Sequence, residues 1–174
     1  MNPREQHNAL LRALKAAFGV VEVENRLFQW LIVPSVSQLQ EPLSEVYDAL
    51  SRYRGCAVFT KAGRQLACDY VVPSRHLIIE YDERQHFSMP RAVAIRLNPK
   101  ALPLLFDSGQ WIRYCEEIRA VDTSPPYRDE QRAFYDSMRD LLAPEHGYRV
   151  KRLKDGAFDW TRPDAGDEIN RWRV

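Results

Sequence analysis

The spacing of hydrophobic residues over the first third of the chain predicts a helix, a β-rich segment and a second helix. Apolar residues recur every three or four positions over residues 4–18, which is typical of an amphipathic helix that ends at a glycine. Residues 20–33 are rich in Val, Phe, Trp, Leu and Ile, which indicates one or two strands closed by a proline. Residues 41–55 begin with Glu-Pro, continue with a buried helical face and end in glycine, so they predict another helix.

From residue 56 the pattern changes from a period of 3.6 to short β-type runs. These runs cover residues 57–60, 65–72 and 76–81, and turn signals containing glycine or proline separate them. Short strands joined by short turns predict an antiparallel β-meander.

Helical periodicity returns in the second half of the chain. Residues 113–119 and 128–142 show it, and the second of these helices follows a Pro-Pro breaker. Residues 148–153 are typical of a short strand, whereas residues 158–174 have no clear period. This order of elements predicts a mixed α/β domain.

Composition sets limits without identifying a partner. Among the 174 residues, 25 Lys and Arg stand against 24 Asp and Glu, so a net charge of +1 provides no overall basic field for nucleic acid. Positive charge gathers locally over residues 149–154, which form either a stripe able to meet phosphate or a solvated strand face. No apolar run approaches the roughly 20 residues of a membrane helix, and the first residues lack a signal-peptide pattern. We therefore expect a cytoplasmic protein that does not engage a membrane.

The three cysteines argue against two further classes of site. They form no C-x-x-C pair, and an odd count does not suit a disulfide framework. We expect neither disulfide bonds nor a thiolate zinc site.

The candidate chemistry lies in residues 68–87. Asp69 lies towards the end of one predicted strand, and Glu80 and Asp82 lie near the end of the next. Side chains at positions i and i+2 of a strand share a face, so Glu80 and Asp82 point the same way. Two such carboxylates on a core strand repel each other and lose hydration unless a cation lies between them. The alternative is that all three are separate surface carboxylates on an edge strand.

A hard divalent cation would resolve this conflict. Mg²⁺ is held by one or two carboxylates, waters and phosphate oxygens, and such a metal, or Mn²⁺, activates water for attack on a phosphodiester. Gln85 and His86 follow the carboxylates and could orient that water. The sequence therefore predicts a metal-dependent phosphodiester hydrolysis site.

The same segment resembles a known nuclease superfamily. Its order of residues is similar to that of the PD-(D/E)XK nucleases, nearest to proteins like the very-short-patch-repair endonucleases. The matching positions are Asp69-Tyr70, Pro73, Ile79-Glu80, Asp82 and Gln85-His86. The resemblance implies a restriction-endonuclease-like α/β fold with a central mixed sheet flanked by helices. It also implies metal binding by Asp69 and Glu80 and hydrolysis of DNA.

The resemblance extends to further site residues. Asp82 stands where the superfamily usually has its lysine, so we expect Asp82 to bind the metal or a second ion. Gln85, His86 or Lys61, from the preceding predicted strand, would then replace the lysine. An acidic residue on the helix before the meander often joins such a site, and Glu45 is the matching position here.

Three arginines are candidates for phosphate contacts. Arg91 follows Pro90 near the carboxylates, and its planar guanidinium suits a phosphate. Arg128 and Arg132 lie one helical turn apart on the same face. Their helix either contacts phosphate or is an exposed helix laced with ion pairs of ~0.3–0.5 kcal/mol each, and the second interpretation is favoured.

These features together predict a Mg²⁺- or Mn²⁺-dependent endonuclease that acts on DNA in restriction, repair or defence. Residues 1–174 would form one nuclease-like domain, with the N-terminal helix and C-terminal tail added to its core, and a homodimer would let two sites reach two strands. One rival is a catalytically silent nucleic-acid-binding module of the same fold. The other is a metal hydrolase of small phosphate esters, which would need a closed pocket in place of an open cleft.

Overall fold

Helices and strands are mixed along the chain. The computed structural model describes residues 2–25 and 28–172. Its helices and strands are, in order, α1 (Pro3–Phe18), β1 (Glu22–Asn25), α2 (Leu43–Arg54), β2 (Cys68–Val72), β3 (Leu77–Asp82), α3 (Met89–Arg96), α4 (Ser108–Ile118), α5 (Arg128–Glu145), β4 (Arg149–Lys154) and α6 (Ala165–Asn170). Short 3-10 turns lie at Gln29–Leu31, Val36–Gln38, Pro73–Arg75 and Arg84–His86.

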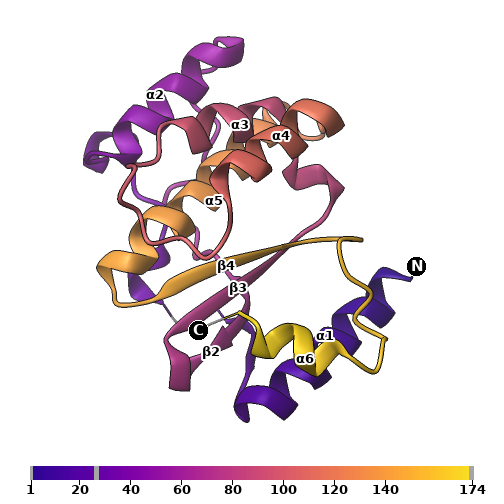
Figure 1. Cartoon of the computed structure of the whole chain (residues 1–174). Helices are drawn as coiled ribbons and strands as arrows, with labels where there is room; N and C mark the ends of the chain where they lie inside the picture. The colour runs from indigo at the N-terminus through magenta and orange to yellow at the C-terminus, as the bar shows by residue number, and fades with distance from the viewer. Residues whose placement is uncertain (1, 26–27, 173–174) are drawn as a thin grey trace.

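The four strands form one mixed sheet in the order β1-β2-β3-β4. β1 and β2 run antiparallel, as do β2 and β3, whereas β4 lies parallel to β3. The sheet is flanked on one side by α1 and α6 and on the other by α2, α3, α4 and α5 (Figure 1). β3 is therefore a central strand, covered on both faces, and the carboxylates that it carries are not on an edge.

The period-two alternation of β3 separates two hydrophobic clusters. Leu77 and Ile79 pack with residues of α1 and α6, whereas Ile78 packs with residues of α2 and α5. Glu80 and Asp82 share parity with Ile78, so they belong to the face that α5 covers. Over the described part of the chain, no helix combines the length and apolar character needed to cross a membrane.

Most of the predicted elements are confirmed. The helices expected over residues 4–18, 41–55 and 128–142 and the strand over residues 148–153 are present with small shifts at their ends. The β-rich segment over residues 20–33 contains one short strand, β1, and a 3-10 turn among its described residues, which agrees with the expectation of one or two strands; residues 26 and 27 lie outside the described part.

The strand predicted over residues 57–60 is wrong. This segment forms a loop, and β1 takes the place of the first strand of the meander. Phe59 is the reason for the apolar signal, because its ring stacks on Tyr47 at 4.5 Å as a core anchor. The short helix α3 was not predicted. It is buried on most sides, and the residues at its exposed positions are too few to produce an amphipathic stripe.

Candidate functional site

Asp69 and Glu80 lie at the junction of β2 and β3. Tyr70 pairs with Ile79 in the antiparallel register, so one step further along Asp69 lies opposite Glu80. The Asp69 carboxylate Oδ2 accepts a hydrogen bond of 2.8 Å from the backbone N–H of Tyr81. The Asp69 carboxylate therefore takes the place of a backbone acceptor in the hydrogen-bond ladder between β2 and β3, and this contact fixes Asp69 beside the buried end of β3.

Glu80 is a buried acid with an unsatisfied oxygen. Its side chain is 4% exposed, and its Oε2 lies 3.2 Å from Nε of Arg139 on α5. Among the described residues nothing donates a hydrogen bond to its buried Oε1. Burial raises the pKa of Glu80 to about 8, with a smaller contribution from the negative charge of Asp69. Burial also raises the pKa of Asp69. The two acids thus occupy a place where added positive charge would be stabilising.

Asp82 has a different environment from the one predicted. Its Oδ1 lies 2.7 Å from Nη1 of Arg152, and its Oδ2 accepts a hydrogen bond of 2.7 Å from the indole N–H of Trp111. Its side chain is 1% exposed. Because both oxygens already have strong donors, the structure assigns Asp82 to an internal ion pair, and the expectation that it binds a metal is corrected.

The ion pair of Asp82 belongs to a network of buried charges under the sheet. Arg152 also donates to Oδ1 of Asp140 at 2.9 Å, and Arg91 donates to the other oxygen of Asp140. Three guanidiniums (Arg91, Arg139 and Arg152) face four carboxylates (Glu80, Asp82, Asp136 and Asp140). The conflict inferred from sequence is therefore resolved largely by arginine side chains from α3, α5 and β4.

His86 is held at the mouth of this network. The 3-10 turn after β3 brings its Nδ1 to 3.0 Å from Oδ2 of Asp136 and to 3.6 Å from Oδ1 of Asp82. Burial alone would lower the pKa of His86, but the neighbouring Asp136 carboxylate outweighs it and raises that pKa. In return, although burial opposes its ionisation, His86 and Arg152 hold the pKa of Asp136 well below its usual range.

The His86 contact predicts a loss of stability as pH rises. A histidine whose pKa is raised in the folded state contributes stability that is complete below the unfolded pKa of about 6.5 and is lost as pH rises through the higher folded pKa. We expect the free energy of unfolding, measured with urea, to fall across this range, and His86→Gln to remove the part of that fall that His86 contributes, while the raised pKa of Glu80 contributes the rest. His146→Gln, at an exposed position, is the control and should keep the slope. An unchanged slope in His86→Gln would contradict the assignment.

A small pocket with a volume of about 90 Å³ opens beside His86. We call it the arginine pocket, because four of its lining residues are arginines; it is lined by Arg64, His86, Arg128, Gln131, Arg132, Tyr135, Asp136 and Arg139. The predicted phosphate-contacting residues Arg128 and Arg132 both lie there. The favoured interpretation of their helix as exposed is wrong, since most of α5 is buried.

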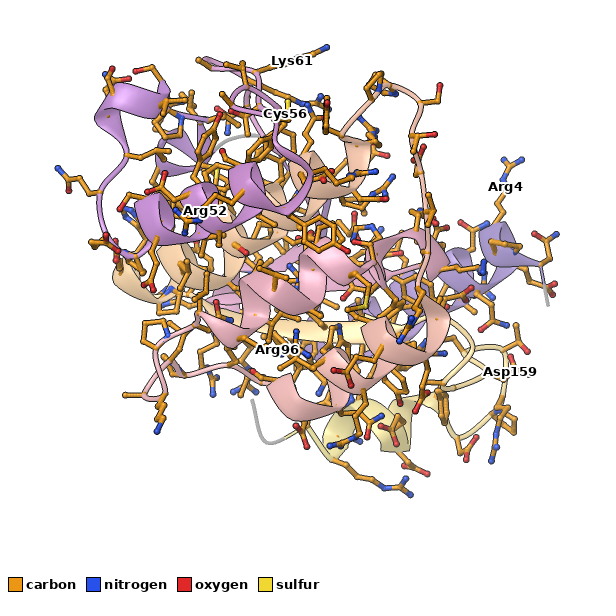
Figure 2. All side chains as sticks on the ribbon, turned by 90° about the horizontal axis from the view of Figure 1, so that it is seen from above. Arg4, Arg52, Cys56, Lys61, Arg96 and Asp159 are labelled. Atoms are coloured by element: carbon orange, nitrogen blue, oxygen red, sulfur yellow. The ribbon has the colours of Figure 1, made fainter. Side chains whose placement is uncertain are left out.

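The remaining predicted residues lie outside the pocket lining. Arg91 is buried, 1% exposed, and paired with Asp140, so its expected role as a surface phosphate contact is corrected. Glu45 is exposed on α2 and makes none of the site contacts described above. Lys61 lies in a loop and not on a strand, with its side chain pointing away from the molecule (Figure 2). The Gln85 side chain donates to Glu83, two positions before it.

Sequence reasoning missed the residues from α5 and β4 that complete the site. Arg139 binds Glu80, Asp136 binds His86, and Arg152 binds Asp82. The one available signal is in β4, where Arg152 shares strand parity with Val150, a core residue. Parity therefore places Arg152 on a buried face, where an arginine requires carboxylate partners.

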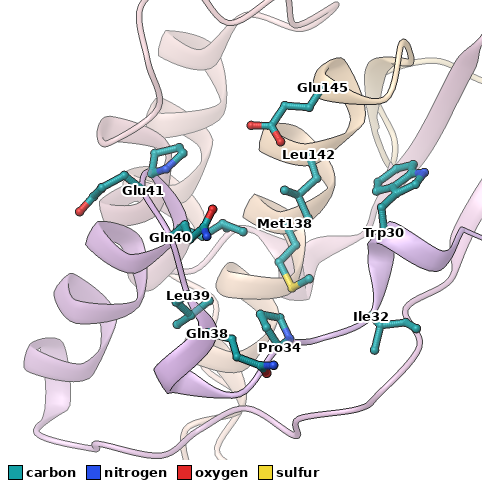
Figure 3. A pocket seen from close by; sticks show the side chains of 12 residues that line it. Trp30, Ile32, Pro34, Gln38, Leu39, Gln40, Glu41, Met138, Leu142 and Glu145 are labelled. Atoms are coloured by element: carbon teal, nitrogen blue, oxygen red, sulfur yellow. The ribbon is translucent and has the colours of Figure 1, made fainter.

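A second pocket, on another side of α5, is unsuited to phosphate. It has a volume of about 270 Å³ and lies between Trp30, the loop over residues 38–42, and Met138 and Leu142 of α5 (Figure 3). The described residues that line it include Glu41 and Glu145 but no Arg, Lys or His. None of the predicted site residues lies there.

Within residues 2–25 and 28–172, no group of three or more His, Cys, Asp or Glu side chains is arranged to hold a metal ion. The Asp69–Glu80 pair is thus the strongest remnant of the predicted metal site. Comparison with known proteins found no matching family model, curated protein or solved structure.

Proposed function

We propose that the protein hydrolyses phosphodiester bonds of nucleic acid, DNA in the first place, with the help of Mg²⁺ or Mn²⁺. The observation that carries the proposal is the pair Asp69 and Glu80, opposite each other at a strand junction, with a buried Glu80 oxygen that no described group satisfies. The resemblance of residues 68–87 to the PD-(D/E)XK nucleases supports it, and so does the mixed sheet flanked by helices.

The donor set fits a hard divalent cation. Mg²⁺ is typically bound by one or two carboxylates and completes its shell with waters and substrate phosphate oxygens. Asp69 and Glu80 supply two carboxylates, and one Glu80 oxygen accepts no hydrogen bond from the described residues. Such a cation would polarise the phosphodiester and lower the pKa of a bound water.

The surrounding residues supply the other needs of the reaction. The guanidiniums that line the arginine pocket would bind phosphate oxygens and stabilise the charge that develops on them. Asp136 fixes the ring of His86 through Nδ1, which leaves Nε2 to exchange a proton with water or a leaving oxygen. This division of labour does not require Asp82, which remains an internal partner of Arg152.

The test is a cleavage assay on supercoiled plasmid, linear duplex, single-stranded DNA and RNA, with Mg²⁺, with Mn²⁺ and with a chelator. We expect cleavage only with metal, and we expect Asp69→Asn to lose it, because asparagine keeps the hydrogen bond from Tyr81 but not the charge. Asp48→Asn, exposed on α2, should retain full activity. The proposal fails if no substrate is cut with either metal, or if Asp69→Asn cuts as fast as the unaltered protein.

One observation favours a second candidate function. The Arg139 guanidinium already lies against Glu80, so the protein has its own cation at the carboxylates. A catalytically silent module that binds nucleic acid without cutting it would need nothing more. Salt-dependent binding of DNA, without cleavage under any metal condition, would favour this candidate.

A further inference from the structure

We infer that the arginine pocket binds a terminal phosphate group, the dianionic phosphomonoester at an end of a nucleic-acid strand. The inference deepens the proposed function and rests on it for the identity of the ligand as nucleic acid. It depends on three properties of the pocket: which of its cations lack partners, how large it is, and where it lies.

Two of the four arginines in the pocket form no ion pair with a carboxylate in the part of the chain that the structure describes. Arg132 pairs with Asp122 at 3.0 Å, and Arg139 pairs with Glu80. Arg128, by contrast, donates to the uncharged side chain of Gln131, and the Arg64 guanidinium lies 5.6 Å from the centre of the Tyr135 ring. Two guanidiniums thus line the same small space without a carboxylate in ion-pair contact with either of them.

This charge matches a phosphomonoester better than a phosphodiester. Near neutral pH a phosphomonoester carries a charge of roughly −1.5 to −2, whereas an internal phosphodiester carries a single negative charge. A monoester also has three free oxygens, each able to accept from a planar guanidinium. A terminal phosphate therefore satisfies both unpartnered arginines, which an internal phosphodiester would leave partly uncompensated.

The size of the pocket limits the ligand to one group. Its volume of about 90 Å³ is far below the roughly 300–1,000 Å³ of pockets that enclose a whole small molecule. A phosphate fits, whereas the sugar and base attached to it must remain outside. The pocket should therefore recognise the phosphate itself and discriminate little among the nucleotides that carry it.

The position of the pocket relates phosphate binding to the proposed hydrolysis. His86 and Arg139 line it, and Arg139 in turn contacts Glu80, so the pocket adjoins the proposed reaction site. A strand end held there would place nearby internucleotide linkages of the same strand at a fixed distance from Asp69 and Glu80. The expected consequence is cleavage measured from an end.

The experiment measures binding without metal, so that nothing is cut. Fluorescence anisotropy is recorded for one single-stranded DNA sequence in three forms, with a 5′-phosphate, with a 3′-phosphate, and with hydroxyls at both ends. We expect a phosphorylated form to bind at least about tenfold more tightly, the gain typical of charge-assisted hydrogen bonds. The 5′ and 3′ forms identify which end is read, and inorganic phosphate should compete with whichever form binds.

Substitutions connect this preference to the pocket. Arg64→Gln and Arg128→Gln should each reduce it severalfold or more. Arg4→Gln, at an exposed position of α1 on the other side of the sheet from α5 (Figure 1), is the matched control and should leave it unchanged. Thermal unfolding of each variant verifies that the fold is intact.

Equal affinity for all three DNA forms would overturn the inference, as would a preference that survives both pocket substitutions. These outcomes are separable from those of the cleavage assay. Metal-dependent cleavage without a preference for phosphorylated ends would retain the proposed function and reject the pocket. A preference for phosphorylated ends without cleavage would retain the pocket and favour the silent module.

Discussion

Replacing Arg152 with methionine is expected to cost roughly 3–5 kcal/mol of unfolding free energy, the usual result of breaking a buried ion pair from one side. The Arg152 side chain is fully buried and lies within 3.5 Å of Asp82, Asp136 and Asp140. Methionine fills a similar space but leaves these carboxylates with fewer cations in a medium that solvates charge poorly. Small domains are typically stable by only about 5–15 kcal/mol, so this loss is a large part of the total free energy of unfolding.

Urea unfolding at neutral pH measures this loss. Arg171→Met is the matched control, because Arg171 is 70% exposed and its pair with Glu168 is at the surface, where such pairs contribute about 0–1 kcal/mol. A loss for Arg152→Met no larger than that of Arg171→Met would show that the network is not a source of stability. The burial of Asp82 would then require another explanation than its pairing with Arg152.

Glu80→Gln is expected to abolish the proposed cleavage and to make the folded protein more stable at alkaline pH. In the proposed function Glu80 is a metal ligand, and the bound metal lowers the activation barrier of hydrolysis by several kcal/mol. Loss of the Glu80 charge would therefore lower the cleavage rate by on the order of a thousandfold. Glutamine keeps the length and shape of the side chain. The substitution therefore removes charge and little else.

The stability gain follows from the pKa of Glu80, which burial raises to about 8. Between the unfolded pKa of about 4.5 and this value, the folded state holds a proton that the unfolded chain has released, so stability falls as pH rises through that window and is level above it. Glutamine has no such proton to lose. The advantage of Glu80→Gln should thus grow from about pH 5 to pH 8, by at most about 1.4 kcal/mol for each pH unit.

Paired unfolding and cleavage measurements from pH 5 to 9 check both expectations. Glu83→Gln, which alters a half-exposed carboxylate three positions further on, serves as the control and should change neither quantity much. A Glu80→Gln variant that is less stable than the unaltered protein at pH 8 would mean that its ion pair with Arg139 outweighs the cost of burial. Full retention of cleavage would exclude Glu80 from the site.

The sequence was informative where the signal is local. Strand parity predicted that Glu80 and Asp82 share a face, and the buried cluster around Ile78 confirms the side to which that face belongs. The helix over residues 128–142 was also located correctly. Both conclusions use only the period of a single element.

The partners of those carboxylates were not predictable from local signals. Arg139 and Arg152 reach β3 from elements much later in the chain, and the arginines of α5 have the same spacing as those of an exposed helix with surface ion pairs. Only the packing of α5 against the sheet decides between the two, and this packing depends on contacts between distant segments. For the same reason the sequence predicts a phosphate contact for Arg91, whereas the structure buries Arg91 against Asp140.

The parallel pairing of β3 with β4 constrains how the chain acquires its structure. Three helices separate the two strands, and β4 carries the arginine that compensates Asp82. Until β4 docks, the central strand has acidic side chains facing a half-formed core, so the antiparallel strands β1 to β3 gain little by collapsing early. Contacts between such distant segments also slow folding. Assembly of the sheet should therefore be a late and cooperative event. A nascent chain whose β4 segment has not yet emerged from the ribosome should remain largely unfolded.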